Sequence, residues 1–93
     1  MSRKVRLRLY VTGSAPNSIA ALANMKAVRA ALDEDHELEI VDVLERPERA
    51  LADDVLVTPT LLKLAPRPSC RIVGNLSNIH QVLSSLGIAQ GAA

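Results

Sequence analysis

The chain has 93 residues, of which 48% are hydrophobic, and its eleven basic and ten acidic residues leave a formal net charge of +1. A chain of this length forms one small domain with a modest core, and a nearly neutral charge offers no long-range attraction to a polyanion. Tyr10 is the only aromatic residue, so the stacking platforms of single-strand nucleic-acid binders are missing. The composition therefore argues against nucleic-acid binding.

Cysteine content and N-terminal composition bear on the cellular compartment. The single cysteine, Cys70, excludes an internal disulfide, and no N-terminal apolar stretch resembles a signal peptide or a membrane span. We expect a cytoplasmic protein that contacts no membrane, with one domain over residues 1–93 and a flexible tail over residues 88–93.

The first half of the chain predicts a strand, a helix and a second strand. Apolar residues alternate with polar ones from Val5 to Val11, which predicts a strand with one apolar and one polar face. After a turn at residues 13–17, apolar residues recur every three or four positions as far as Leu32 and predict an amphipathic helix. The predicted apolar stripe consists of Ile19, Leu22, Met25, Val28 and Leu32. Residues 38–44 are rich in branched aliphatics and predict a strand parallel to the first.

The second half predicts a short helix, a strand hairpin and a final helix. Pro47 precedes a run of good helix formers, and residues 57–64 and 69–74 predict two antiparallel strands. Residues 77–86 carry apolar side chains at helical spacing. The resulting order, βαβαββα, is that of a thioredoxin-like α/β domain.

The ends of the predicted elements carry their own signals. Pro59 restricts its strand to an edge, an end or a bulge. Ser77 is expected to be the N-cap of the last helix, and Gly87 is expected to end it. In the turn after the first strand, Ser14 and Asn17 are expected to make turn and capping contacts.

No candidate catalytic, metal or cofactor site emerges from the sequence. The turn at residues 13–18 lies where thioredoxins carry a Cys-x-x-C motif, yet it contains no thiol. Ser18 has no histidine placed to activate it, and His36, His80 and Cys70 lack the spacing of a metal site. We therefore expect no enzymatic activity, no metal and no cofactor. A monothiol reaction at Cys70 is the remaining enzymatic alternative.

Four blocks of sequence carry a more specific resemblance. The segments LRLYVTGSAPNS, VDVLERPERA, VTPTLLKL and RIVGNLS resemble successive blocks of the circadian clock protein KaiB family, in the family's order along nearly the whole chain. The resemblance implies a non-enzymatic regulatory protein that binds a KaiC-type ATPase ring and competes with a thioredoxin-like sensor-kinase domain. A redox-inactive sensory module of a histidine-kinase system is the alternative.

The resemblance also implies two folds, a thioredoxin-like monomer and a tetrameric ground state with the order βαββααβ. The ground state would require a helix around Pro59 and residues 66–68, although a proline inside a helix costs about 3 kcal/mol. It would also require a strand over residues 77–87, against their helical spacing. The local signals therefore favour the thioredoxin-like monomer.

Two sets of site residues follow from the resemblance. The expected partner-binding residues are Arg8, Glu37, Glu39, Lys63 and Arg71. The expected fold-switch residues are Pro59, Pro66, Pro68, Ser85 and Gly87. The family commonly has basic residues where this chain has Ala20 and Glu39, an Asp in place of Asn75 and an acidic residue in place of Gly87. The charge on the expected binding surface is therefore altered, most of all at Glu39.

Overall fold

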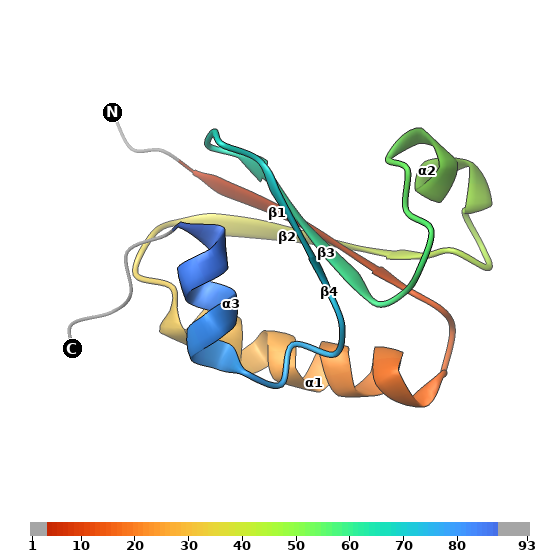
Figure 1. Cartoon of the computed structure of the whole chain (residues 1–93), viewed down its shortest axis with the longest axis horizontal. Helices are drawn as coiled ribbons and strands as arrows, with labels where there is room; N and C mark the ends of the chain where they lie inside the picture. The colour runs from red at the N-terminus through yellow and green to blue at the C-terminus, as the bar shows by residue number, and fades with distance from the viewer. Residues whose placement is uncertain (1–3, 88–93) are drawn as a thin grey trace.

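The computed structural model describes residues 4–87, which form a four-stranded sheet and three helices (Figure 1). The elements are β1 (Val5–Val11), α1 (Pro16–Ala31), β2 (His36–Asp42), α2 (Pro47–Ala52), β3 (Thr60–Ala65), β4 (Cys70–Val73) and α3 (Ile79–Leu86). The predicted order βαβαββα is confirmed. The expected tail at residues 88–93 lies outside the described residues.

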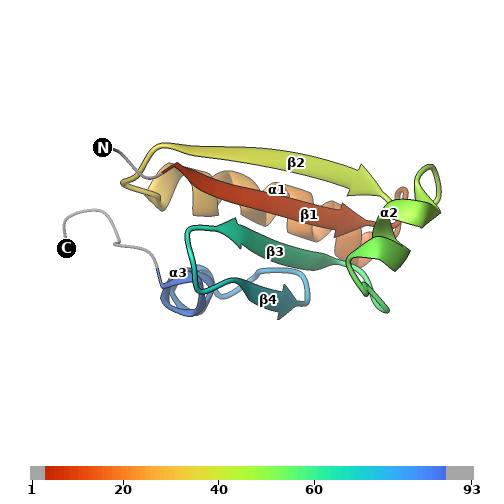
Figure 2. The ribbon, with the colours of Figure 1, turned by 90° about the horizontal axis from the view of Figure 1, so that it is seen from above.

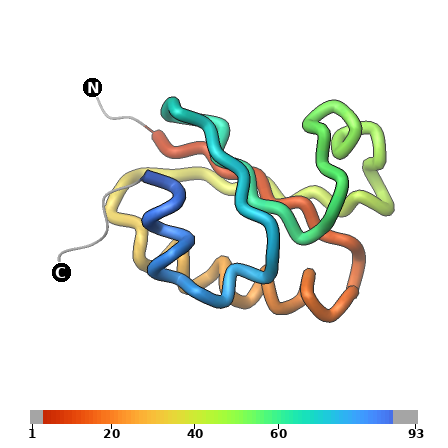
Figure 3. The backbone as a smooth tube through the Cα atoms, in the orientation of Figure 1, coloured from red at the N-terminus to blue at the C-terminus, as the bar shows by residue number. Residues whose placement is uncertain are grey.

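The sheet has the strand order β2-β1-β3-β4. Strands β1 and β2 are parallel, as the strand–helix–strand pattern predicts, whereas β3 runs antiparallel to both β1 and β4. Helices α1 and α3 lie side by side on one face of the sheet, and α2 lies on the opposite face (Figures 1 and 2). The chain turns from β1 into α1 at the same end of the molecule as α2 (Figure 3).

The main core lies between the sheet and the pair α1 and α3. Alternate residues of β1 point into it, and the apolar stripe of α3 covers it from the other side. Its buried members are Val5, Leu7, Leu9, Val11, Ala21, Met25, Val28, Leu61, Leu76, Val82, Leu83 and Leu86. The apolar periodicity of the last helix therefore identified a real core face.

The buried face of α1 includes Met25 and Val28 of the predicted stripe but differs from that stripe at Ile19. Ile19 is 53% exposed, whereas Ser18, one position earlier, is 1% exposed and faces the sheet. The Ser18 hydroxyl accepts a hydrogen bond from the Thr12 backbone N–H at 2.9 Å, which satisfies a donor at the end of β1. In its first turns α1 therefore faces the sheet with the small residues Ser18 and Ala21.

A second, smaller core lies under α2, where a polar strand face was expected. Tyr10 is fully buried there together with Val41, Ala50 and Leu62. Helix α2 packs on the sheet face opposite α1 and α3 and covers Tyr10 near the C-terminal end of β1. The expectation that this face of β1 is polar throughout was therefore wrong at Tyr10.

Three element boundaries also differ from the prediction. Strand β2 ends at Asp42, because the carboxylate of that residue accepts bonds from the Gly13 and Leu44 backbone N–H groups and closes a turn. Strand β3 begins at Thr60, directly after Pro59 rather than at residue 57. The N-cap of α3 is Asn78 and not Ser77: its side chain accepts from the Gln81 N–H at 3.1 Å.

Candidate partner-binding face

The sheet face opposite α1 and α3 collects most of the expected partner-binding residues. Because β1 and β2 are parallel and in register, Arg6 lies beside Glu37 and Arg8 beside Glu39. Arg71 joins the same face from β4, Arg49 from α2, and Asp53 from the C-cap of α2. We call this set the charged face; its residues are Arg6, Arg8, Glu37, Glu39, Arg49, Asp53 and Arg71.

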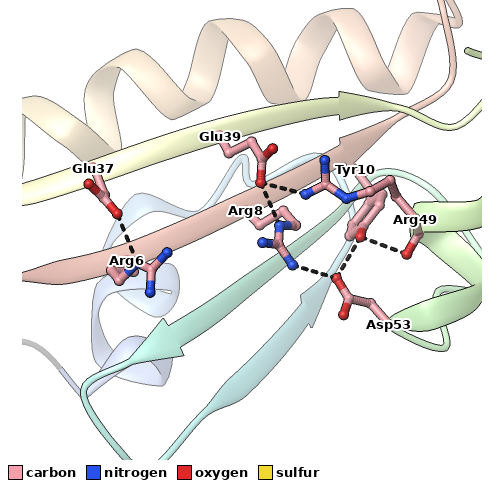
Figure 4. A network of polar contacts seen from close by, with 7 residues as sticks. All are labelled: Arg6, Arg8, Tyr10, Glu37, Glu39, Arg49 and Asp53. Atoms are coloured by element: carbon pink, nitrogen blue, oxygen red, sulfur yellow. Dashed lines mark hydrogen bonds and ion pairs between the residues drawn. The ribbon is translucent and has the colours of Figure 1, made fainter. Parts of the chain in front are cut away.

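Ion pairs cross between the two parallel strands at two levels (Figure 4). Arg6 Nε donates to Glu37 Oε1 at 2.8 Å, and both side chains are more than half exposed. Two residues further along, Arg8 Nε donates to Glu39 Oε1, also at 2.8 Å. The same Glu39 oxygen accepts from the Arg49 guanidinium at 2.7 Å. The Arg49 and Arg8 hydrogen bonds lower the pKa of Glu39 from 4.5 to about 2, so Glu39 is a carboxylate at neutral pH.

Asp53 anchors the inner end of this network. Its Oδ2 atom accepts from Arg8 at 2.8 Å and from the buried Tyr10 hydroxyl at 2.5 Å, and the Tyr10 hydroxyl also lies 2.9 Å from the Arg49 carbonyl oxygen. Burial alone would raise the pKa of Asp53, but hydrogen bonds from Tyr10 and Arg8 outweigh it and lower that pKa. The C-terminal end of α2 is thereby fixed to β1 through side chains.

Arg71 reinforces the same attachment from β4. Its guanidinium donates to the backbone carbonyls of Asp53 and Asp54, at 2.6 and 2.8 Å. These bonds occupy one side of the guanidinium, and the residue as a whole stays exposed. Arg71 therefore both stabilises the loop after α2 and presents positive charge on the charged face.

Lys63 does not join the other expected partner-binding residues. It points to the opposite side of the sheet, is 3% exposed, and donates from Nζ to the Leu86 carbonyl oxygen at 2.6 Å. A cation at this place stabilises the C-terminal end of α3. The expectation of a partner contact at Lys63 does not fit its burial in this form, and we leave it out of the proposed binding surface.

The expected fold-switch residues lie in connections and at one helix end. Pro59 directly precedes β3, while Pro66 and Pro68 lie in the turn between β3 and β4. All three follow cis peptide bonds. Ser85 is exposed on α3, and Gly87 closes that helix with a φ of +65°, the left-handed conformation that favours glycine.

Three residues of the charged face, Arg6, Arg49 and Asp53, were not foreseen as site residues, nor was Tyr10, which contacts Asp53. One signal was available, since Arg49 and Asp53 are four residues apart behind the helix-starting Pro47 and so share one side of a helix. That spacing does not show which strand the helix covers. The link from Asp53 to Tyr10 spans 43 positions and depends on tertiary packing.

The turn before α1 offers no catalytic group. Ala15 is the N-cap of α1 and makes no side-chain cap, so the capping contacts expected of Ser14 and Asn17 are not made at this helix end. Cys70 begins β4, and burial raises the pKa of its thiol, which disfavours the reactive thiolate.

Within residues 4–87, no three His, Cys, Asp or Glu side chains are grouped so as to hold a metal ion. The helices of that part of the chain are all too short or too polar to cross a membrane.

The element order βαβαββα and the strand order β2-β1-β3-β4 define a thioredoxin-like α/β domain. The N-terminal domain of Synechococcus elongatus SasA has the same fold, with a TM-score of 0.75 and 22% identity over 100% of this chain and 92% of that domain. Chloroplastic thioredoxin z also has a TM-score of 0.75, at 17% identity over 90% of this chain and 76% of its own.

The sequence comparisons assign the chain more narrowly. The KaiB domain model matches residues 8–88. The circadian clock protein KaiB3 of Synechocystis sp. is 43% identical over 86 residues, and the circadian clock oscillator protein KaiB of Synechococcus elongatus is 41% identical over 86 residues. Both alignments span 91% of this chain and 84% of the relative. The chain belongs to the KaiB family.

Proposed function

We propose that this chain is a non-enzymatic regulatory protein of the clock type that binds a KaiC-type ATPase ring through the charged face. One observation carries the proposal: four of the five residues expected to contact a partner, Arg8, Glu37, Glu39 and Arg71, lie together on one sheet face. The names of the relatives, which are circadian clock proteins, support the regulatory class. A sensor histidine kinase is the second partner to test, since the fold is also that of the SasA N-terminal domain.

Binding kinetics with Arg8 variants test the proposal. Arg8→Glu should slow association with the ring, and the loss should shrink at high salt because screening weakens long-range attraction. Arg8→Gln removes the positive charge without placing a third carboxylate beside Glu39 and Asp53, and it should show the same trend more weakly. Lys26→Glu is the matched control, because Lys26 is exposed on α1, on the other side of the sheet.

The outcomes separate the two partner classes. Slower association of Arg8→Glu with the ring, and unchanged association of Lys26→Glu, supports the charged face as the contact. Equal association rates for both variants and the parent chain at low salt would reject it. The same measurement with the kinase in place of the ring shows which partner the charged face prefers.

The absence of catalysis is tested separately. The chain has one cysteine and a thiol-free turn, so we expect no reduction of insulin disulfides, which requires a pair of exchanging thiols. Cys70→Ser should leave partner binding unchanged, because Cys70 lies on the helix-covered side of the sheet and not on the charged face. Measurable insulin reduction that is lost in Cys70→Ser would show a redox activity.

A further inference from the structure

The Oε1 atom of Glu39 lies between two guanidinium groups that come from different elements. Arg8 donates to it from β1 at 2.8 Å, and Arg49 donates to it from α2 at 2.7 Å (Figure 4). Two arginines that converge on one oxygen have the chemistry of a carboxylate-binding site, because each charge-assisted bond favours an anion at that point. Within the described chain, Glu39 itself occupies this site.

We propose that Glu39 is an internal competitor for a carboxylate-binding site formed by Arg8 and Arg49, and that an acidic side chain of the partner protein takes its place in the complex. The inference rests on the proposed function, since it takes the charged face as the surface that meets the partner. It adds the chemistry of the contact, an exchange of one carboxylate for another, and it assigns a binding role to Arg49.

The Arg8 side chain and the Arg49 backbone are held by contacts other than those with Glu39. Arg8 is 20% exposed and donates through a second nitrogen to Asp53 at 2.8 Å, while Asp53 is itself held by Tyr10. The backbone of Arg49 is fixed in α2, and its carbonyl oxygen contacts the Tyr10 hydroxyl. When the Glu39 side chain leaves, Arg8 therefore keeps its orientation and Arg49 its place above it.

The Glu39 side chain can turn away from the two arginines into solvent. Its side chain is 46% exposed, and it lies on β2, an edge strand of the sheet, so it has solvent on one side. An ion pair this exposed is weak, because water and salt screen it and because the flexible side chains lose entropy when they are held together. A carboxylate on the partner's surface can therefore replace Glu39 with only a small loss of free energy from the broken ion pair.

Glu37 supplies a matched control two residues away. It lies on the same strand and the same face, its side chain is 51% exposed, and it also pairs with an arginine at 2.8 Å. Among residues 4–87 a single guanidinium, that of Arg6, contacts Glu37, and the Lys4 Nζ atom lies 3.8 Å from the other carboxylate oxygen. Neutralising Glu37 or Glu39 changes the net charge equally, but only Glu39 vacates a site between two arginines.

The binding experiment compares Glu39→Gln, Glu37→Gln and Glu39→Gln combined with Arg49→Gln, each with the immobilised KaiC-type ring. We expect Glu39→Gln to bind about fivefold more tightly than the parent chain, because an exposed ion pair contributes up to about 1 kcal/mol. Glu37→Gln should change the affinity less. Adding Arg49→Gln should remove the gain. Equal affinities for Glu39→Gln and Glu37→Gln, or a gain that survives Arg49→Gln, would overturn the inference and leave the proposed function standing if Arg8→Glu still weakens binding.

A partner-free measurement tests the site itself. Hexaglutamate peptide is titrated into the full chain, and the Nε–Hε resonances of Arg8 and Arg49 are followed by NMR. In Glu39→Gln both resonances should shift at a severalfold lower peptide concentration than in the parent chain. If the resonances shift at the same peptide concentration in both proteins, Glu39 does not compete with the peptide for the two arginines. If Arg8→Glu leaves ring binding intact but the peptide result holds, the proposed function fails and the carboxylate site remains.

Discussion

Lys63 offers the sharpest test of how the last helix is held. The Lys63→Met substitution keeps most of the apolar stem but removes the ammonium group that donates to the Leu86 carbonyl oxygen at 2.6 Å. A hydrogen bond made by a charged group contributes about 1.5–3 kcal/mol, and a cation at a helix C-terminus adds about 0.3–1 kcal/mol. Burial of the ammonium offsets part of this gain. We therefore expect Lys63→Met to lower the free energy of unfolding by about 1–3 kcal/mol.

Urea unfolding measures this loss. The midpoint should fall while the slope stays constant, which shows that stability and not the denatured state has changed. Lys26→Met on the exposed side of α1 is the control and should change the free energy by less than about 0.5 kcal/mol. If Lys63→Met is as stable as the parent chain, the contact with Leu86 does no more than compensate for burying the charge, and the reasoning is refuted. A slower association with the partner in Lys63→Met would return Lys63 to the binding surface.

Three further perturbations test the network and the helix end. Tyr10→Phe removes the buried hydroxyl that contacts Asp53 at 2.5 Å and should cost about 1–2 kcal/mol of unfolding free energy in urea. Gly87→Ala forces a side chain into a φ of +65° and should cost about 1 kcal/mol, although the nearest atom to the new Cβ is 3.9 Å away; equal stability would show that the helix end rearranges. Because the pKa of Glu39 is lowered, its contribution is present above pH 4.5 and is lost as the pH falls toward about 2. Acid unfolding of Glu39→Gln should lack this loss, which stays below about 1 kcal/mol for so exposed a group.

The order of the elements could be predicted because each one carries a local signal. The alternation in β1, the proline at the start of α2 and the apolar spacing in α3 all report backbone geometry over a few residues. Boundaries were missed where two signals compete within two positions. Ser77 and Asn78 are both good N-caps, and Asn78 serves because its side chain reaches the Gln81 N–H while the Asn75 side chain takes the N–H of Ser77.

The burial of Tyr10 depends on tertiary packing that no local pattern reports. A tyrosine on a strand face shared with Arg6 and Arg8 fits solvent as well as a core, and only the placement of α2 decides between them. The same packing brings Asp53 into contact with Arg8 and Arg49 into contact with Glu39. The family resemblance therefore pointed to Arg8 and Glu39 but not to the two residues of the α2 region that contact them. The burial of Lys63 could not be predicted for the same reason: a lysine in a strand is normally exposed, and here the C-terminal end of α3 covers it.

The charged face is complete only while α2 is packed on the sheet, because Arg49 and Asp53 come from α2 and its C-cap. At six residues, α2 is far below the length at which an isolated helix is stable in water, so its helical form depends on the bonds that Tyr10, Arg8 and Arg71 make to its C-terminal end. Those bonds in turn place Arg49 above Glu39. Any arrangement of the chain that detaches α2 therefore removes the second arginine from the carboxylate site and frees Arg8 from Asp53 at the same time. The packing of α2 and the chemistry of the charged face are therefore linked, and any partner that binds the charged face would also stabilise the packed form of α2 by mass action.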